Sequence, residues 1–167
     1  MRNASILVFF LLATATHVHA QSPVASLDSK TIAENKELDR LLIEAHEERD
    51  VNKAINLFVK SPNTFFIAPN GAIFNGWEQI RDTYAQFLGG LESITGEIQH
   101  VTYFRAGDGV IGLGTVVFHR KDKGQPVRDL TVVWTDYGRK ENGEWKYLFR
   151  HAHWPIAGWP DQHRGAM

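Results

Sequence analysis

Four long β-strand segments joined by short turns fill the second half of the chain, and this feature limits the fold more than any other. They cover approximately 93–105, 110–120, 127–137 and 144–153. Gly107-Asp108-Gly109 and Asn142-Gly143 have the composition of tight turns. Strands joined by such short connections pair with their chain neighbours in antiparallel fashion. The sequence therefore predicts an antiparallel meander.

The first half of the chain has helical periodicity, interrupted by a short hairpin at 64–68 and 72–74. Three segments carry apolar residues at helical spacing: Leu38, Leu41, Leu42 and Ala45; Val51, Ala54, Ile55 and Phe58; and Trp77, Ile80, Tyr84, Phe87 and Leu88. Asp28 or Ser29 can cap the first helix, and Asp50 the second. We interpret all three apolar stripes, including that of the third helix, as core.

Helices followed by a long meander are typical of an α+β fold. We expect three N-terminal helices packed on a strongly curved antiparallel sheet. Gly112 and Gly114 within one strand indicate a bend or a close backbone approach. A curved sheet needs helices over its concave face, and incomplete cover leaves a pocket.

Composition excludes several classes of protein. The 167 residues include 18 Lys and Arg against 19 Asp and Glu, which gives no basic surplus for nucleic-acid binding. The chain has no cysteine, which excludes a disulfide framework, a thiolate zinc site and a cysteine nucleophile. An apolar content of 43% is that of a globular domain rather than a disordered chain.

The N-terminus has the pattern of an export signal. Arg2 precedes an uncharged apolar run at 6–13, and Val18-His19-Ala20 ends in small residues suited to a signal peptidase. We expect cleavage after Ala20 and a secreted or periplasmic product with no membrane segment. The chain then divides into a signal peptide (1–20), a leader (21–28), one α+β domain (29–155) and a C-terminal tail (156–167).

The end of the chain combines tryptophans with prolines. Pro155 and Pro160 prevent continuation as a ladder-bonded strand. We expect this segment to leave the sheet and to lay Trp154 and Trp159 on an apolar surface, either the pocket mouth or a partner subunit.

Several motifs resemble those of the nuclear transport factor 2-like superfamily, over roughly 29–155. Asn70-Gly71 followed by the run 74–80 is similar to its turn and third-helix entry. The run 131–134 resembles its penultimate strand, and 142–145 with 150–154 resembles its closing strand. The superfamily includes ketosteroid isomerases, SnoaL-type cyclases and the association domain of calmodulin-dependent kinase II. The resemblance implies a cone-shaped, cystatin-like α+β fold that hosts many functions.

His151 and His153 are the first candidates for chemistry. Residues two apart on a strand face the same side, and we expect this pair to share the inward face with Trp145, Tyr147 and Phe149. They could act as a general acid and base, as anion ligands or as metal ligands. The alternative is a pair of hydrogen-bonded structural histidines at the strand end.

Arg128 and Asp129 are consecutive, so that one of them should point at the concave face. A carboxylate enclosed there would have a raised pKa and could act as a base or a hydrogen-bond donor. The alternative is that both charges are solvated at a strand entrance. We predict that Asp129 and His153 line one cavity. Further candidate ligand contacts are Tyr103, His119, Arg128 and Trp134.

Together these observations predict a secreted protein that binds a small, largely apolar organic molecule. A catalytic version would transfer a proton beside a carbonyl, as in isomerisation or cyclisation, and needs no cofactor. The alternative is a non-catalytic association module, and a weaker one is metal-assisted chemistry at the histidine pair. Apolar residues occur on both faces of the second long strand, with Ile111, Leu113 and Val117 on one face. A sheet apolar on both faces needs two covers, and we expect a homodimer through the outer one.

Overall fold

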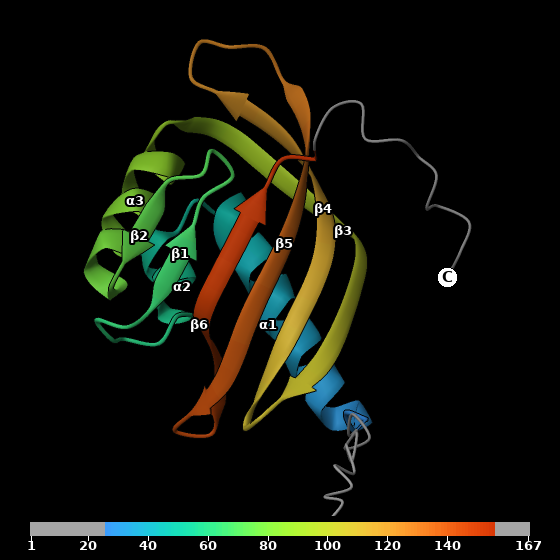
Figure 1. Cartoon of the computed structure of the whole chain (residues 1–167). Coiled ribbons are helices and arrows are strands. Elements are labelled where there is room, and N and C mark those ends of the chain that lie inside the picture. Colours follow the sequence, from blue (N-terminus) through green and yellow to red (C-terminus); the bar gives the residue numbers. More distant parts are fainter. Residues whose placement is uncertain (1–25, 156–167) are drawn as a thin grey trace, which may run out of the picture.

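The computed structural model describes residues 26–155, which form three helices and one six-stranded sheet (Figure 1). The elements follow the order α1 (Ser29–Glu47), α2 (Val51–Asn56), β1 (Phe65–Ile67), β2 (Ile73–Asn75), α3 (Trp77–Gly89), β3 (Leu91–Ala106), β4 (Gly109–Asp122), β5 (Arg128–Glu141) and β6 (Glu144–His153). The expected signal peptide, most of the leader and the tail from residue 156 lie outside the described residues. No helix of residues 26–155 is long and apolar enough to cross a membrane.

Local chemistry sets the ends of the helices and the turns. The Asp28 side chain caps α1 by accepting a hydrogen bond from the Thr31 N–H at 2.8 Å, and Asp50 caps α2 through Lys53. Asn142 and Gly143 have positive φ angles of 53° and 88°, the requirement of a tight hairpin turn between β5 and β6. Both sets of expectations are confirmed.

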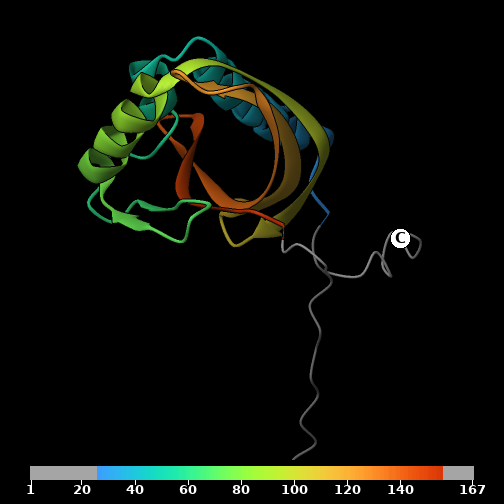
Figure 2. The ribbon, with the colours of Figure 1, turned by 90° about the horizontal axis from the view of Figure 1, so that it is seen from above.

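The sheet has the strand order β2-β1-β6-β5-β4-β3. Strands β3 to β6 form the expected antiparallel meander. The sheet as a whole is mixed, because β1 pairs with β6 in parallel. Seen from above, the sheet is strongly curled, and the helices lie along one side of it (Figure 2).

The core lies between the helices and the concave face of the sheet. One buried cluster joins all three helices to the strands, with Leu42, Ile55, Ile80 and Leu88 almost fully excluded from solvent. A second cluster holds Ile43 of α1 against Val116, Val132 and Trp134 of β4 and β5. The helices cover the concave face incompletely, and a cavity remains.

Candidate functional site

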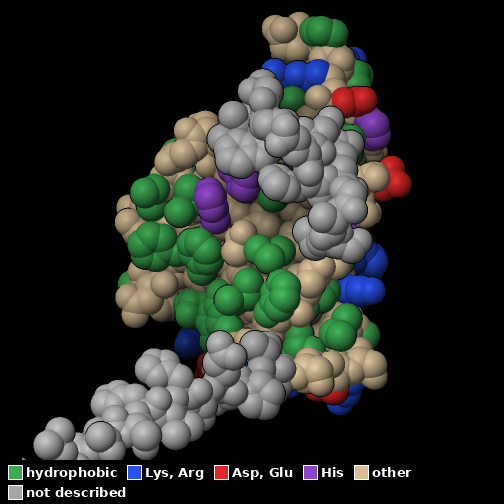
Figure 3. Space-filling view, turned by 45° about the vertical axis from the view of Figure 1, so that its right-hand side comes forward, with side chains coloured by type: hydrophobic (Ala, Val, Ile, Leu, Met, Phe, Trp, Pro, Cys, Tyr) green, Lys and Arg blue, Asp and Glu red, His purple; other side chains and the backbone are tan. Residues whose placement is uncertain are grey.

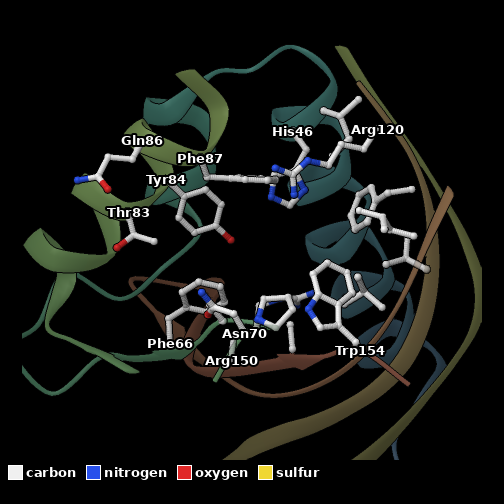
Figure 4. A pocket seen from close by; sticks show the side chains of 18 of the residues that line it. His46, Phe66, Asn70, Thr83, Tyr84, Gln86, Phe87, Arg120, Arg150 and Trp154 are labelled. Atoms are coloured by element: carbon white, nitrogen blue, oxygen red, sulfur yellow. The ribbon is translucent and has the colours of Figure 1, made fainter. Parts of the chain in front are cut away.

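The cavity has a volume of about 490 Å³ and lies between α3, β1–β2 and the concave face of β3 to β6. Its wall is mainly apolar, with Phe66, Phe87, Phe118, Leu130 and Val132 among its residues. Asn70, Thr83, Gln86 and Trp154 add polar and aromatic groups (Figure 4). This size and lining are typical of a site for a small organic molecule.

Three polar side chains enter this apolar space from three different elements. His46 comes from the last turn of α1, Tyr84 from α3 and Arg150 from β6. The Tyr84 hydroxyl points into the space between α3 and the opposite wall (Figure 4). Arg120 also contributes to the lining, and among the described lining residues there is no aspartate or glutamate.

His46 is held as a neutral imidazole. Burial, and then the nearby positive charge of Arg150, lower the pKa of His46 to about 3. Its ring stacks on Tyr84 at 5.7 Å between centroids and meets the edges of Phe87 and Phe118. The buried Nδ1 has no hydrogen-bond partner within residues 26–155. A buried nitrogen without a partner is costly, and it marks a place where a ligand could bind.

Arg150 is held in place at the wall of the cavity by aromatic and acidic neighbours. Its guanidinium lies over the rings of Trp134 and Tyr147, 5.2 and 4.9 Å from their centroids. Nη1 donates to Asp136 Oδ2 at 2.8 Å and is 3.5 Å from Asp39 Oδ1. Because the arginine is 7% exposed and both carboxylates are also buried, this is an internal ion cluster in which a lost partner would leave an uncompensated charge.

Two tyrosines complete the ion cluster. The Tyr103 and Tyr147 hydroxyls each donate to Asp39 at 2.7 Å. Burial, followed by the charge of Asp39, raises the pKa of both phenols, which stay protonated as donors. Burial also raises the pKa of Asp136 to about 7, although Arg150 opposes that rise. Asp136 therefore titrates near neutral pH while the tyrosines do not.

Two glycines of β4 make room for this arrangement. Gly112 pairs with Asp136, and Gly114 with Trp134, across the β4–β5 ladder. A Cβ at Gly112 would lie 2.6 Å from Asp136 Oδ1, and one at Gly114 would overlap the Trp134 indole. The expected close approach of another backbone is not found at these two glycines, because side chains, mainly those of Asp136 and Trp134 of β5, occupy the space.

The expected inward placement of His151 and His153 is wrong. Tyr147 pairs with Gly138 and Phe149 with Tyr137, so that Leu148 is an extra residue, a β-bulge. The bulge reverses the alternation along β6: Tyr147 and Arg150 face the cavity side, whereas neither histidine is among the described lining residues. The two imidazoles lie together on the other face, 5.4 Å apart between centroids.

Asp129 and His153 do not line one cavity, contrary to the prediction. Asp129 lies on the outer face and its Oδ1 is 2.6 Å from Nδ1 of His119, its partner across the ladder; both side chains are about half exposed or more. Arg128 has the inward parity but is 56% exposed and bonds to Asp122. For this pair the alternative of solvated charges holds. Within residues 26–155 no group of three His, Asp or Glu side chains is arranged to hold a metal.

Other predicted residues do lie on the cavity side. Tyr103 bonds to Asp39 and Trp134 packs under Arg150, so that both support the site from behind its wall. Trp154 lines the cavity, as one of the two alternatives for the tail predicted, whereas Trp159 lies outside the described residues. The stripe of the third helix is more than core, because Tyr84 and Phe87 also line the cavity.

Sequence reasoning missed His46, Asp39, Asp136 and Arg150. A signal existed for the first two. His46 follows Leu38 and Leu42 at intervals of four, and Asp39 precedes Leu42 by three, which places both on the apolar side of α1. Arg150 had no such signal, because the bulge that turns it inward interrupts the alternation used to assign faces.

Comparison with solved structures identifies the architecture. A protein described as a dehydratase of the NTF2-like family from Streptomyces avermitilis is 20% identical, with a TM-score of 0.70, over 77% of this chain and 98% of that one. A calcium/calmodulin-dependent kinase II association-domain protein from Thiobacillus denitrificans is 17% identical, with a TM-score of 0.63, over 72% and 94%.

A third similar structure, a protein with a cystatin-like fold from Nostoc punctiforme, is 16% identical, with a TM-score of 0.66, over 80% of this chain and 97% of that one. No protein-family model and no curated protein matches the sequence. At these identities the likeness shows the fold, and function has to be argued from the site.

Proposed function

The chain has the NTF2-like fold, and on this scaffold we propose that it binds a small, largely apolar organic molecule in the cavity beside Arg150. The observation that carries the proposal is the convergence of His46, Tyr84 and Arg150 on one apolar space of about 490 Å³. An apolar wall supplies affinity through burial, and a few fixed polar groups supply orientation. The similar structures described as a dehydratase and as scytalone dehydratase are compatible with chemistry in such a cavity.

Each polar group has a distinct part in this proposal. The Tyr84 hydroxyl donates a hydrogen bond to a ligand oxygen, because burial raises its pKa to about 12 and keeps the proton in place. Arg150 supplies a fixed positive charge beside that oxygen. Neutral His46 offers a ring nitrogen that can exchange a hydrogen bond or a proton with the ligand.

In a catalytic version the same groups would favour proton transfer beside a carbonyl. Removing that proton places negative charge on the carbonyl oxygen, and pre-oriented donors stabilise such charge more than they stabilise the neutral reactant. Arg150 and Tyr84 are those donors. The cavity thus supports isomerase, cyclase or dehydratase chemistry, in which fixed donors stabilise negative charge that develops on a carbonyl oxygen.

Isothermal titration calorimetry with naphthalene and pyrene derivatives that carry a ketone, amide or carboxylate group tests the proposal. Leu130→Trp would fill the cavity, whereas Thr131→Trp puts the same bulk on the opposite face of β5. We expect binding at micromolar concentrations that Leu130→Trp weakens at least tenfold and Thr131→Trp leaves unchanged. Absence of binding across the panel, or binding that survives Leu130→Trp, would contradict the proposal.

A second candidate function is a non-catalytic association module. It is favoured by exposed apolar side chains on the outer face of the sheet, including Phe104 and Leu113, and by the fold of the association-domain protein. In that case the oligomer forms through the outer face and the panel of ligands does not bind. The expected export signal adds a further proposal, a mature N-terminus at Gln21, which intact-mass analysis of secreted material tests.

A further inference from the structure

We propose that the cavity takes its ligand as a carboxylate held against Arg150, and that Asp136 takes up a proton when this carboxylate binds. The inference rests on the proposed function and names the chemical class of its ligand: an apolar, ring-sized carboxylic acid in its ionised form. Three features of the described residues carry it, namely the charges in the cavity wall, the free side of the Arg150 guanidinium and the groups around Asp136.

The charges of the described lining residues are all positive. Arg120 and Arg150 contribute to the wall, and no carboxylate does. The counter-ions lie elsewhere: Arg120 Nε donates to Asp122 at 3.0 Å, and Arg150 pairs with Asp39 and Asp136. A molecule in the cavity can therefore contact the arginines directly, whereas the carboxylates that pair with them lie behind the wall. The charge of Arg150 also acts on His46 and Tyr84, whose pKa values it lowers as a secondary cause after burial.

The guanidinium of Arg150 has donors left for a ligand. Within residues 26–155, its hydrogen bonds to Asp136 and Asp39 both start at Nη1. Arginine carries five N–H donors in a planar fork that matches the two oxygens of a carboxylate. The rings of Trp134 and Tyr147 both contact the planar guanidinium and hold it in place. The Arg150 side chain would therefore lose little conformational entropy when a ligand binds.

Charge balance connects ligand binding with Asp136. The buried cluster holds one guanidinium and two carboxylates, so that with both carboxylates ionised it is already negative. A further carboxylate would add repulsion in a poorly solvated place. Protonation of Asp136 removes that repulsion, because Arg150 can then serve Asp39 and the ligand.

The groups that face Asp136 are compatible with this role. They are Arg150 and Tyr147 from β6, Asp39 from α1, Tyr103 from β3, the backbone N–H of Gly112 from β4 and the indole of Trp134 from β5. The phenols remain protonated and Arg150 remains charged. A pKa of about 7 leaves Asp136 largely ionised at pH 8 in the empty protein, so a proton can be taken up there.

Matched pairs of probes test the inference: 2-naphthoate against 2-naphthamide, and pyrene-1-carboxylate against pyrene-1-carboxamide. Both acids have a pKa of about 4, as carboxylic acids do, and stay ionised between pH 6.5 and 8.5. We expect each acid to bind at least tenfold more tightly than its amide. We also expect the affinity of the acids, and not that of the amides, to fall as the pH rises through this range.

Calorimetry in buffers of different ionisation enthalpy measures the proton directly, with an expected uptake of up to one proton per bound acid. Asp136→Asn should remove both the uptake and the pH dependence. Arg150→Met should remove the preference for acids. Arg128 is a cation outside the cavity, so Arg128→Gln should change neither the preference for acids nor the proton uptake. If Arg150→Met fails to fold, the uptake measurement on the unmodified chain and on Asp136→Asn still decides the matter.

The outcomes separate this inference from the proposed function. Amides that bind as tightly as the acids, or acid binding with no proton uptake, would overturn the carboxylate–Asp136 inference and leave the binding cavity in place. Absence of binding by all four probes would overturn both.

Discussion

At the scale of single residues, two glycines decide how the concave side of the sheet is filled. Gly112 and Gly114 leave space that Asp136 and Trp134 occupy from the neighbouring strand. Trp134 is 1% exposed and its ring packs against the Arg150 guanidinium. A displacement of the indole would therefore also displace Arg150 and disturb the ion cluster. The absence of two side chains on β4 is therefore a condition for the site on β5 and β6.

Gly114→Ala should destabilise the protein. The new Cβ would overlap the Trp134 indole, a rigid group enclosed by the core, and overpacking of this kind costs about 1–3 kcal/mol. Urea denaturation measures the free energy of unfolding. Gly89→Ala is the matched control, since a Cβ there meets nothing within 4 Å, and equal stability of the two variants would contradict the argument.

His46→Gln should change how stability depends on pH. Burial lowers the pKa of His46 to about 3 in the folded protein, from 6.5 in a solvated chain. Between these values the unfolded chain binds more protons, so this residue makes the protein less stable as the pH falls from 6.5 toward 3.

The stability of the unmodified chain relative to His46→Gln should therefore fall by about 1.4 kcal/mol for each pH unit between pH 6 and 4. Denaturant unfolding of both proteins at several pH values measures the difference. Parallel stability curves would show that the imidazole is not held neutral in the folded protein.

At the scale of elements, the β-bulge of β6 determines which chemistry enters the cavity. Without the bulge, regular alternation that includes Leu148 would place His151 and His153 on the side where Tyr147 lies. With it, Arg150 and Ala152 lie there, and the histidines face outward. The bulge thus exchanges two imidazoles for one guanidinium.

Deletion of Leu148 should leave the ion cluster in place. Because Leu148 is the extra residue, its removal keeps Tyr147 opposite Gly138 and Phe149 opposite Tyr137, and regular alternation then holds Tyr147 and Arg150 on the cavity side. We expect the deletion to cost about as much as Leu148→Ala, about 1 kcal/mol for a half-buried residue. Thermal and urea unfolding compare the two variants. A loss of about 3–5 kcal/mol for the deletion alone, the cost of breaking a buried pair, would contradict this register.

At the scale of the whole molecule, the sheet has apolar side chains on both faces. The concave face is covered by the helices and surrounds the cavity. The outer face bears Ile111, Leu113, Val133 and Phe149, and hydrophobic and histidine side chains gather on the face seen in Figure 3. Phe104 is 44% and Leu113 39% exposed there, which is more apolar surface than single scattered residues give.

We expect a homodimer through this outer face, with sedimentation velocity at micromolar protein as the measurement. Leu113→Lys should shift the distribution toward monomer, because the buried charge would have no counter-ion in the interface. Val127→Lys is the matched control: Val127 is 60% exposed, but it lies on the β4–β5 connection rather than on the face. A monomeric unmodified chain, or equal dimer affinity of both variants, would contradict this expectation.

The sequence by itself determined the elements and their order. Helical spacing of apolar residues, the caps Asp28 and Asp50, and the Asn142-Gly143 turn act within a few residues of the chain. Local patterns of this range can be recognised without a structure, and they predicted the α+β order, the meander and the incompletely covered concave face. They also drew attention to Gly112 and Gly114, although side chains rather than backbone approach these glycines.

The ion cluster beside the cavity was decided by tertiary structure alone. Asp39, Asp136 and Arg150 come from α1, β5 and β6 and are up to 111 residues apart in sequence, so no local pattern relates them. The face on which Arg150 lies depends on a bulge, which alternation cannot reveal when apolar residues stand on both sides of it. The pKa of Asp136 is raised because the folded chain removes that carboxyl from water and places Asp39 near it.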